Sequence, residues 1–226
     1  MGMPMSIDLR DASVAPGALD AAFAVLRRAD GLFSTYRPDS EISRLEAAEL
    51  ALEDCSPDVQ AVLACCEELR RRTDGWFDAR AGGTLDPSGL VKGWAVERAR
   101  EALVGAGVRH GCINAAGDVR VWGGRRGGEP WRVGVRDPLV ADRVGAVVTL
   151  HDGAVATSGA YERGDHIIDP HTRRPARGVL SVTVTGPDLA EADAYATALF
   201  AMGARPAEWF ARQSAYRASI VAAPES

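Results

Sequence analysis

Two oxygen-bearing side chains, Asp193 and Thr197, stand four residues apart in the otherwise largely apolar stretch EADAYATALFAMG, residues 191–203. In a helix, residues four apart lie on one face, one turn above the other. Such a pair suits a hard cation, because Mg2+ prefers oxygen ligands. Taken alone, the stretch also allows a simpler interpretation, in which Asp193 is a first-turn carboxylate favoured by the helix dipole and Thr197 is incidental.

A second group of candidate residues lies in LDPSGLVKGWAVERA, residues 85–99, where Asp86, Gly89 and Lys92 precede an expected helix. A glycine-containing approach to a helix N-terminus suits anions, because free backbone N–H groups point at them. The pattern of a phosphate-binding P-loop is absent. Lys92 is therefore a candidate phosphate contact, and an exposed lysine in a first helical turn is the alternative.

Further polar stretches interrupt the apolar pattern, and each alone is compatible with ordinary turn chemistry. They are FSTYRPDSEISRL (33–45), INAAGDVRVWG (113–123), VATSGAYER (155–163) and HIIDPHT (166–172). Together they combine a cationic anchor, an aromatic side chain and several acidic oxygens. This combination suggests an aromatic ligand that contains phosphate, together with a hard metal ion.

Composition and charge exclude several classes of protein. The 226 residues are enough for a substantial core, in one large domain or two joined lobes. A net charge of −5 gives no general attraction to nucleic acid or anionic membranes. No apolar run reaches the roughly 18 residues of a membrane-spanning helix. We therefore expect no nucleic-acid partner and no membrane segment.

Cysteine usage and the first residues bear on compartment and metals. The four cysteines include no CxxC pair, and the four histidines lack metal-ligand spacing, so neither a disulfide framework nor a zinc site is expected. The opening MGMPMSIDLR lacks the basic-then-apolar build of a signal peptide and has no cysteine for lipid attachment. These features favour a cytoplasmic protein.

Helical periodicity is clearest in four segments. Apolar residues recur at helical spacing over 17–33, and a second helix is expected from Pro57 to just before Gly75. A third is expected over 93–104, and the stretch 189–203 provides the fourth.

Strand patterns dominate after residue 111, and a short strand is also expected over 5–9. Two hairpins are expected, one joining VRVWGG to WRVGVRDP and one joining GAVVTL to AVATSG. LSVTVTG and ASIVAA are further strands. With helices mainly N-terminal and strands mainly C-terminal, the order favours an α+β fold over a regular parallel α/β sheet.

Taken in order, the polar stretches resemble the ApbE family, the flavin transferases that attach FMN to proteins using FAD. The resemblance spans residues 1 to about 203 and implies an ApbE-like α+β fold, a single domain over residues 1–226 made of two closely packed lobes. It rests on nine motifs in the family's order: MGMPMSIDL, STYRPDSEISRL, GWFDA, DPSGLVKGWAVERA, INAAGD, WRVGVRDP, ATSGAYER, HIIDPHT and SVTV…EADAYATALFAMG.

The resemblance implies a metal site and a flavin site. By family position, Asp193, Thr197 and the backbone carbonyl of Gly89 would be the Mg2+ ligands. The positions expected to bind FAD are Met1, Tyr36, Asp78, Asp86, Lys92, His166 and Ile167. Tyr36 would lie against the isoalloxazine ring, which Met1 and Asp78 would border.

Four positions depart from the family's usual pattern. Ala116 and Arg173 stand where the family commonly has glycine, Glu46 replaces a usual asparagine, and Ala160 replaces a frequent acidic residue. Many relatives are also exported lipoproteins. These differences bear on target choice and compartment more than on FAD binding.

The resemblance implies a reaction in which a threonine or serine hydroxyl of an acceptor flavoprotein attacks the FMN phosphorus of FAD and AMP leaves. Asp193 and His166 are the candidate catalytic groups that accept the hydroxyl proton. Two alternatives stay open. The first is an Mg2+-dependent FAD pyrophosphatase that gives FMN and AMP, and the second is a non-catalytic FAD-binding protein.

Overall fold

The structure, a computed structural model, describes all residues except 1–2, 126, 161–165, 206 and 225–226. A six-stranded antiparallel sheet lies at its centre. In the described part of the chain the strand order is β1-β2-β3-β6-β9-β10. The strands are Met5–Leu9 (β1), Gly111–Ala115 (β2), Asp118–Trp122 (β3), Gly153–Gly159 (β6), Val179–Gly186 (β9) and Arg217–Ala222 (β10). Strands from both ends of the chain therefore belong to one sheet.

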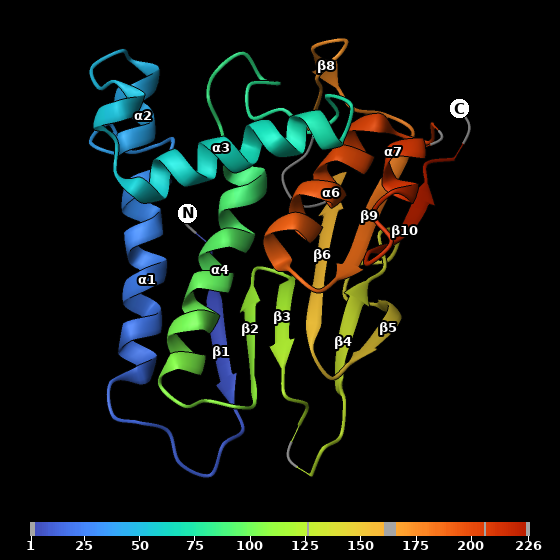
Figure 1. Cartoon of the computed structure of the whole chain (residues 1–226). Coiled ribbons are helices and arrows are strands. Elements are labelled where there is room, and N and C mark those ends of the chain that lie inside the picture. Colours follow the sequence, from blue (N-terminus) through green and yellow to red (C-terminus); the bar gives the residue numbers. More distant parts are fainter. Residues whose placement is uncertain (1–2, 126, 161–165, 206, 225–226) are drawn as a thin grey trace.

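The long helices gather on one face of this sheet (Figure 1). Helices α4 and α6 lie over the strands, and α1 packs on the outer side of α4. The helices are Ala18–Phe33 (α1), Glu41–Glu46 (α2), Pro57–Arg72 (α3), Ser88–Gly105 (α4), Leu189–Met202 (α6) and Glu208–Ala211 (α7), with a 3-10 turn at Leu52–Asp54 (η1). In the residues described, no helix combines the length and apolarity that crossing a bilayer requires.

The two faces of β3 meet different partners. Val119 and Val121 contact Trp131 and Val133 of a separate hairpin, formed by Trp131–Arg136 (β4) and Val144–Leu150 (β5). The alternate residues of β3 face α4. Two of them, Asp118 and Arg120, form ion pairs with charged side chains of that helix. Because side chains alternate along a strand, one face of β3 is apolar and the other carries buried charge.

Helix α6 is buried on nearly all sides, which explains its almost continuous apolar sequence. It lies close against α4 at Gly93. A Cβ atom at Gly93 would come within 2.5 Å of the Leu189 carbonyl oxygen and 2.6 Å of Ala190 Cα. Glycine is therefore required for the two helix backbones to approach this closely.

The four expected helices are present, but α4 begins at Ser88 rather than Gly93. Its first turn follows Pro87, and Asp86 Oδ1 accepts a hydrogen bond from Ser88 N at 2.9 Å. Gly89 and Gly93 have low helix propensity, which hid this turn from the periodicity. Lys92 consequently lies inside the helix rather than at its mouth.

Both expected hairpins are wrong, although the strands themselves are present. Strand β3 pairs with β2 and β6, so neither of its edges is left for β4, and β4 pairs with β5. Likewise β6 pairs with β3 and β9 rather than with β5. The turn-rich segments do reverse the chain, but the two strands that each one joins belong to different sheets. A further short pair joins Ile168–Asp169 (β7) to Arg174–Pro175 (β8).

Candidate active site

Lys92 lies between two carboxylates that come from different elements. Its Nζ is 2.5 Å from Asp118 Oδ2 at the start of β3 and 3.6 Å from Asp193 Oδ1 in the second turn of α6. Asp118 is only 2% exposed and Asp193 only 4%. A lysine, held by these two carboxylates, thus provides a fixed cation where α4, β3 and α6 meet.

Asp118 is a site residue that the sequence prediction missed. Its second oxygen, Oδ1, accepts a hydrogen bond of 2.8 Å from Thr157 N on β6. Each of its oxygens therefore has a partner on a neighbouring element, which fixes the carboxylate facing Lys92. The available signal was the INAAGD motif, in which an aspartate opens an otherwise strand-like run.

The three residues predicted to hold a metal lie on facing turns of α4 and α6. Asp193 and Thr197 are one turn apart on α6, and a Cβ atom at Gly89 would lie 3.3 Å from Thr197 Oγ1. All three offer oxygen atoms, and the missing side chain of Gly89 leaves room beside the threonine hydroxyl. These residues fit a hard cation such as Mg2+.

A different kind of metal site finds no support in the described residues. Within them, no group of three or more His, Cys, Asp or Glu side chains is arranged to hold a metal ion. The cysteines described are free, and burial raises the pKa of the Cys66 thiol to about 12. The described cysteines are therefore present as thiols rather than as disulfides.

The GWFDA segment lies against the start of α4. Phe77 Cε2 would be 3.3 Å from a Cβ atom at Gly89, and Asp86 N donates a 2.7 Å hydrogen bond to Ala79 O. Asp78 Oδ1 accepts a hydrogen bond from Arg80 N at 2.8 Å. Asp78 and Asp86, both predicted flavin contacts, thus belong to two segments joined beside the predicted metal ligands.

The HIIDPHT segment and the residue that follows it contact the GWFDA segment and the residues just beyond it. The His171 and Trp76 rings are in an edge-on contact with centroids 4.2 Å apart, and Arg173 Nη1 donates to Ala81 O at 3.1 Å. At the start of the segment, His166 is exposed and Ile167 is buried. The predicted border of the flavin site therefore adjoins the metal-ligand region through Trp76 and its neighbours.

One predicted flavin contact, Tyr36, belongs to a different segment from this cluster. Tyr36 is 91% exposed in the connection between α1 and α2, so its ring is available to a ligand. Met1 lies outside the described residues. The structure thus brings together Gly89, Lys92, Asp193 and Thr197, and adds Asp118. The roles of all these residues stay predictions, as do those of Tyr36 and Met1.

Two of the departures from the family's usual residues coincide with unusual backbone. Ala116 has a φ of 51° and Arg173 a φ of 58°, both in the left-handed region that glycine adopts without cost. Ala116 and Gly117 form the two-residue turn between β2 and β3, since Ala115 pairs with Asp118. Glycine, which the resemblance leads us to expect at these two positions, would adopt this backbone without strain.

The family model of ApbE matches residues 1–84 and 79–221. The chain belongs to the ApbE family. Among curated members, the FAD:protein FMN transferase of Rhodobacter capsulatus is 42% identical over 157 residues, which are 62% of this chain and 30% of that relative. The enzyme of the same name from Vibrio cholerae is 37% identical over 129 residues, 53% of this chain and 39% of the relative. The chain thus spans less than half the length of these two curated ApbE relatives.

Solved ApbE structures share the whole fold. The ApbE protein of Thermotoga maritima superposes with a TM-score of 0.85 at 26% identity, covering 98% of this chain and 91% of its own. The flavin transferase ApbE of Vibrio cholerae superposes with a TM-score of 0.84 at 25% identity, covering 97% and 90%. The predicted α+β fold of ApbE type, with helices mainly N-terminal and antiparallel strands mainly C-terminal, is confirmed.

Proposed function

We propose that this ApbE-family chain transfers the FMN part of FAD to a threonine or serine hydroxyl of an acceptor protein and releases AMP, in a reaction that requires Mg2+. The names of its relatives support the transfer of FMN to protein. The observation that carries the proposal is the convergence of Lys92, Asp118 and Asp193 from three elements, next to Gly89 and Thr197. A cation and oxygen ligands side by side suit a diphosphate and its metal ion.

In the proposed reaction, the acceptor oxygen forms a bond to the FMN phosphorus as the bond from that phosphorus to the bridging oxygen breaks. The bridging oxygen leaves on AMP. Phosphoryl-type transfers need mainly positioning and charge neutralisation from the protein. Lys92 is suited to this task, because the ion pairs with Asp118 and Asp193 fix the position of its ammonium group before the substrate binds.

The metal ligands we propose are Asp193, Thr197 and the carbonyl of Gly89. When bound there, Mg2+ would supply positive charge to the diphosphate oxygens. Asp193 would then serve as a metal ligand while it also pairs with Lys92, so one carboxylate would be shared by the two positive groups of the site, the metal ion and the ammonium group. The acceptor hydroxyl passes its proton to Asp193 or His166 in this proposal.

The flavin half of the substrate would contact Tyr36, Asp78, Asp86 and Ile167, with Met1 as a further predicted contact. Asp78 and Asp86 are held by backbone hydrogen bonds from Arg80 and Ser88, which leave further acceptor capacity on each carboxylate. These two side chains are therefore suited to accept hydrogen bonds from N–H and O–H groups of the flavin.

Mass spectrometry tests the proposal. The protein is incubated with FAD, Mg2+ and a co-expressed candidate acceptor flavoprotein, and the products are weighed. A mass gain of FMN on the acceptor with release of AMP, both lost when Mg2+ is chelated, supports the transferase. Free FMN and AMP beside unmodified acceptors would instead show a pyrophosphatase, and intact FAD throughout would show a binding protein.

A further inference from the structure

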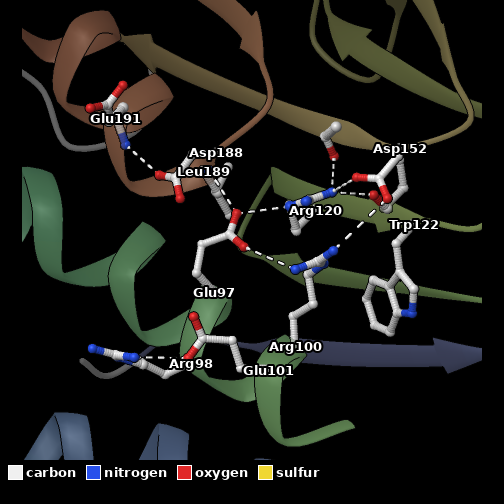
Figure 2. A network of polar contacts seen from close by, with 12 residues as sticks. Glu97, Arg98, Arg100, Glu101, Arg120, Trp122, Asp152, Asp188, Leu189 and Glu191 are labelled. Carbon is white, nitrogen blue, oxygen red and sulfur yellow. Dashed lines mark hydrogen bonds and ion pairs between the residues drawn. The ribbon is translucent and has the colours of Figure 1, made fainter. Parts of the chain in front are cut away.

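A second buried charge lies on the helix-facing side of β3, two residues after Asp118. The Arg120 side chain is only 4% exposed. Its Nε donates to Glu97 Oε1 at 2.8 Å, and its Nη1 donates to Asp152 Oδ1 at 2.7 Å and Gly153 O at 3.1 Å (Figure 2). The guanidinium therefore joins β3 to α4 and to the first residues of β6.

Glu97 is the residue of α4 that this arginine holds, and its carboxylate has a second partner. The same oxygen, Oε1, accepts a hydrogen bond of 2.8 Å from the backbone N of Leu189, the first residue of α6 (Figure 2). The Glu97 side chain is 13% exposed. One largely buried oxygen atom thus contacts β3 and the start of α6 from a side chain on α4.

The same three elements carry the central residues of the proposed active site. Lys92 lies five residues before Glu97 on α4, Asp118 two residues before Arg120 on β3, and Asp193 four residues after Leu189 on α6. Regular helices and strands transmit a displacement along their length. A shift of α6 relative to α4 at Leu189 would therefore change the 3.6 Å separation between Lys92 Nζ and Asp193 Oδ1.

The close contact at Gly93 is independent support for this coupling. Gly93 precedes Glu97 by one helical turn, and its missing side chain admits the backbone of Leu189 and Ala190. Two successive turns of α4 thus contact the start of α6. The turn at Gly93 packs closely against it, and the turn at Glu97 accepts a hydrogen bond from it.

Stability alone does not explain why a charged pair occupies this place. Replacing a buried ion pair by apolar side chains of similar volume is often neutral or stabilising. Burial raises the pKa of the Glu97 carboxyl, and Arg120 opposes that shift, so the carboxylate is kept at a cost. What the pair offers beyond an apolar contact is directional hydrogen bonding to a defined backbone atom.

We propose that Glu97 is a positioning residue, whose Oε1 atom, held between Arg120 and the Leu189 amide, sets the register of α4, β3 and α6 at which Lys92, Asp118 and Asp193 meet. The effect on catalysis rests on the proposed function, whereas the effect on the register of α6 does not. Arg120 acts in the same unit by holding the carboxylate in place.

Kinetics and amide hydrogen exchange of matched variants test the proposal. Glu97→Ala removes the shared oxygen, and Glu97→Gln keeps a carbonyl oxygen that both donors can reach. Two controls lie on the same helix. Glu101→Ala removes an exposed glutamate that pairs with Arg98, and Leu103→Ala removes a fully buried apolar side chain three turns beyond Lys92. Leu103→Ala therefore lowers the melting temperature without touching the proposed register.

For Glu97→Ala we expect kcat for FMN transfer to fall about tenfold or more, with KM for FAD changed much less, because misplaced groups reduce rate before they reduce binding. Amides in the peptide 190–197 should exchange faster. Glu97→Gln should keep kcat within about threefold of wild type, since the hydrogen bonds are retained without the charge. Both controls should keep kcat within about twofold and leave exchange in 190–197 unchanged.

The proposal is overturned if Glu97→Ala keeps the wild-type kcat, or if Leu103→Ala reproduces its losses in kcat and protection. Should Glu97→Ala not fold, Glu97→Asp takes its place, because it keeps the charge but withdraws the oxygen by one methylene. A wild-type kcat in Glu97→Asp would then overturn the proposal. If wild-type protein transfers no FMN, the proposed function fails, and hydrogen exchange alone decides whether Glu97 sets the register.

Discussion

Lys92 provides the positively charged side chain of the proposed site. It contacts one buried carboxylate at 2.5 Å and a second at 3.6 Å, so replacing it leaves both acids without their shared ammonium partner. For Lys92→Met we expect FMN transfer to fall by about a hundredfold or more, in line with the loss of one preorganised electrostatic group. The free energy of unfolding should fall by about 3–5 kcal/mol, because two buried carboxylates lose their partner.

Steady-state transfer rates and urea unfolding measure these two effects. Arg98→Met on the same helix is the matched control, because Arg98 pairs with Glu101 at an exposed position. That variant should keep both rate and stability close to wild type. Unchanged transfer by Lys92→Met would place the substrate phosphates elsewhere.

Ala116 provides a prediction about backbone strain. With a φ of 51° in a two-residue turn, alanine adopts a conformation that favours glycine. Ala116→Gly relieves this strain but makes the unfolded chain more flexible, so we expect a net gain of about 0.5 kcal/mol. The companion Gly117→Ala, at a φ of 104°, should lose about 1–2 kcal/mol.

Thermal or urea unfolding of this pair of variants provides the test. Opposite signs for the two substitutions are the expected result. A loss of stability in both would mean that the alanine methyl at 116 makes a contact worth more than the strain it causes.

At the scale of elements, the meeting of α4 and α6 depends on Gly93. A Cβ atom there would meet the Leu189 carbonyl oxygen at 2.5 Å, so Gly93→Ala forces one helix backbone to move. We expect a loss of about 1–3 kcal/mol, as for other overpacked contacts, and a fall in FMN transfer because Lys92 is the preceding residue.

Gly105→Ala is the control for helix propensity, because nothing lies within 4 Å of a Cβ atom at that end of α4. It should be neutral or stabilise the protein by about 0.5–1 kcal/mol. Measured by thermal unfolding, equal effects of the two glycine substitutions would show that α6 can shift away from α4 at little cost.

The sequence predicted elements better than their pairing. Helical periodicity located α1, α3 and α6 within a residue or two, because each repeats apolar residues over several turns. The pairing of strands is harder to predict from sequence, because a turn-rich segment reverses the chain whether or not the strands before and after it pair with each other. Trp131 and Val133 belong to a different layer from β3, and nothing local to GRRGGEP indicates that.

The candidate site shows a similar division. Motif order led to Gly89, Lys92, Asp193 and Thr197, which the fold brings together. Asp118 and Arg120 were missed as partners because they alternate with Val119 and Val121, and a strand with one solvent-facing polar side has the same pattern. Only the packing of α4 over that face shows that these charges are buried.

At the scale of the whole molecule, α6 is tied to distant segments by ion pairs at both ends. Near its start, Glu191 Oε1 accepts from Arg72 Nη1 of α3 at 2.6 Å, and Arg72 also donates to Gln213 at 3.0 Å. Beyond its end, Arg205 donates to Met202 O at 2.7 Å and to Asp169 Oδ2 at 2.9 Å. Ion pairs therefore help to fix the position of α6 relative to the segments around it.

These ion pairs predict how stability depends on pH. Burial is the largest single influence and would raise the pKa values of Glu191 and Asp169. Hydrogen bonds and the nearby positive charge together outweigh it: Arg72 and two tyrosines act on Glu191, and Arg205 and two backbone N–H groups act on Asp169. Both pKa values therefore lie below their ordinary values of 4.5 and 3.8. The unfolded chain then binds more protons than the folded chain in this acidic range. The stabilisation is full above the ordinary pKa values and is lost as the pH falls through the lowered ones.

Urea unfolding of wild type and of Asp169→Asn/Glu191→Gln at pH 7, 5, 4 and 3 measures this effect. We expect wild type to be more stable by about 2 kcal/mol at pH 7, allowing for the exposure of Arg205, and the difference to shrink toward pH 3. A difference that stays constant with pH would show that the two carboxyls stabilise by shape rather than by charge.

The start of α6 has an electrostatic consequence for anion binding. A long helix usually presents a positive end that attracts phosphate. Here Asp188 Oδ1 accepts from Glu191 N, and Glu97 Oε1 accepts from Leu189 N, so two carboxylates already neutralise that end (Figure 2). The backbone amides of Leu189 and Glu191 already donate to carboxylates, so this end of α6 offers an anion neither of them as a free donor.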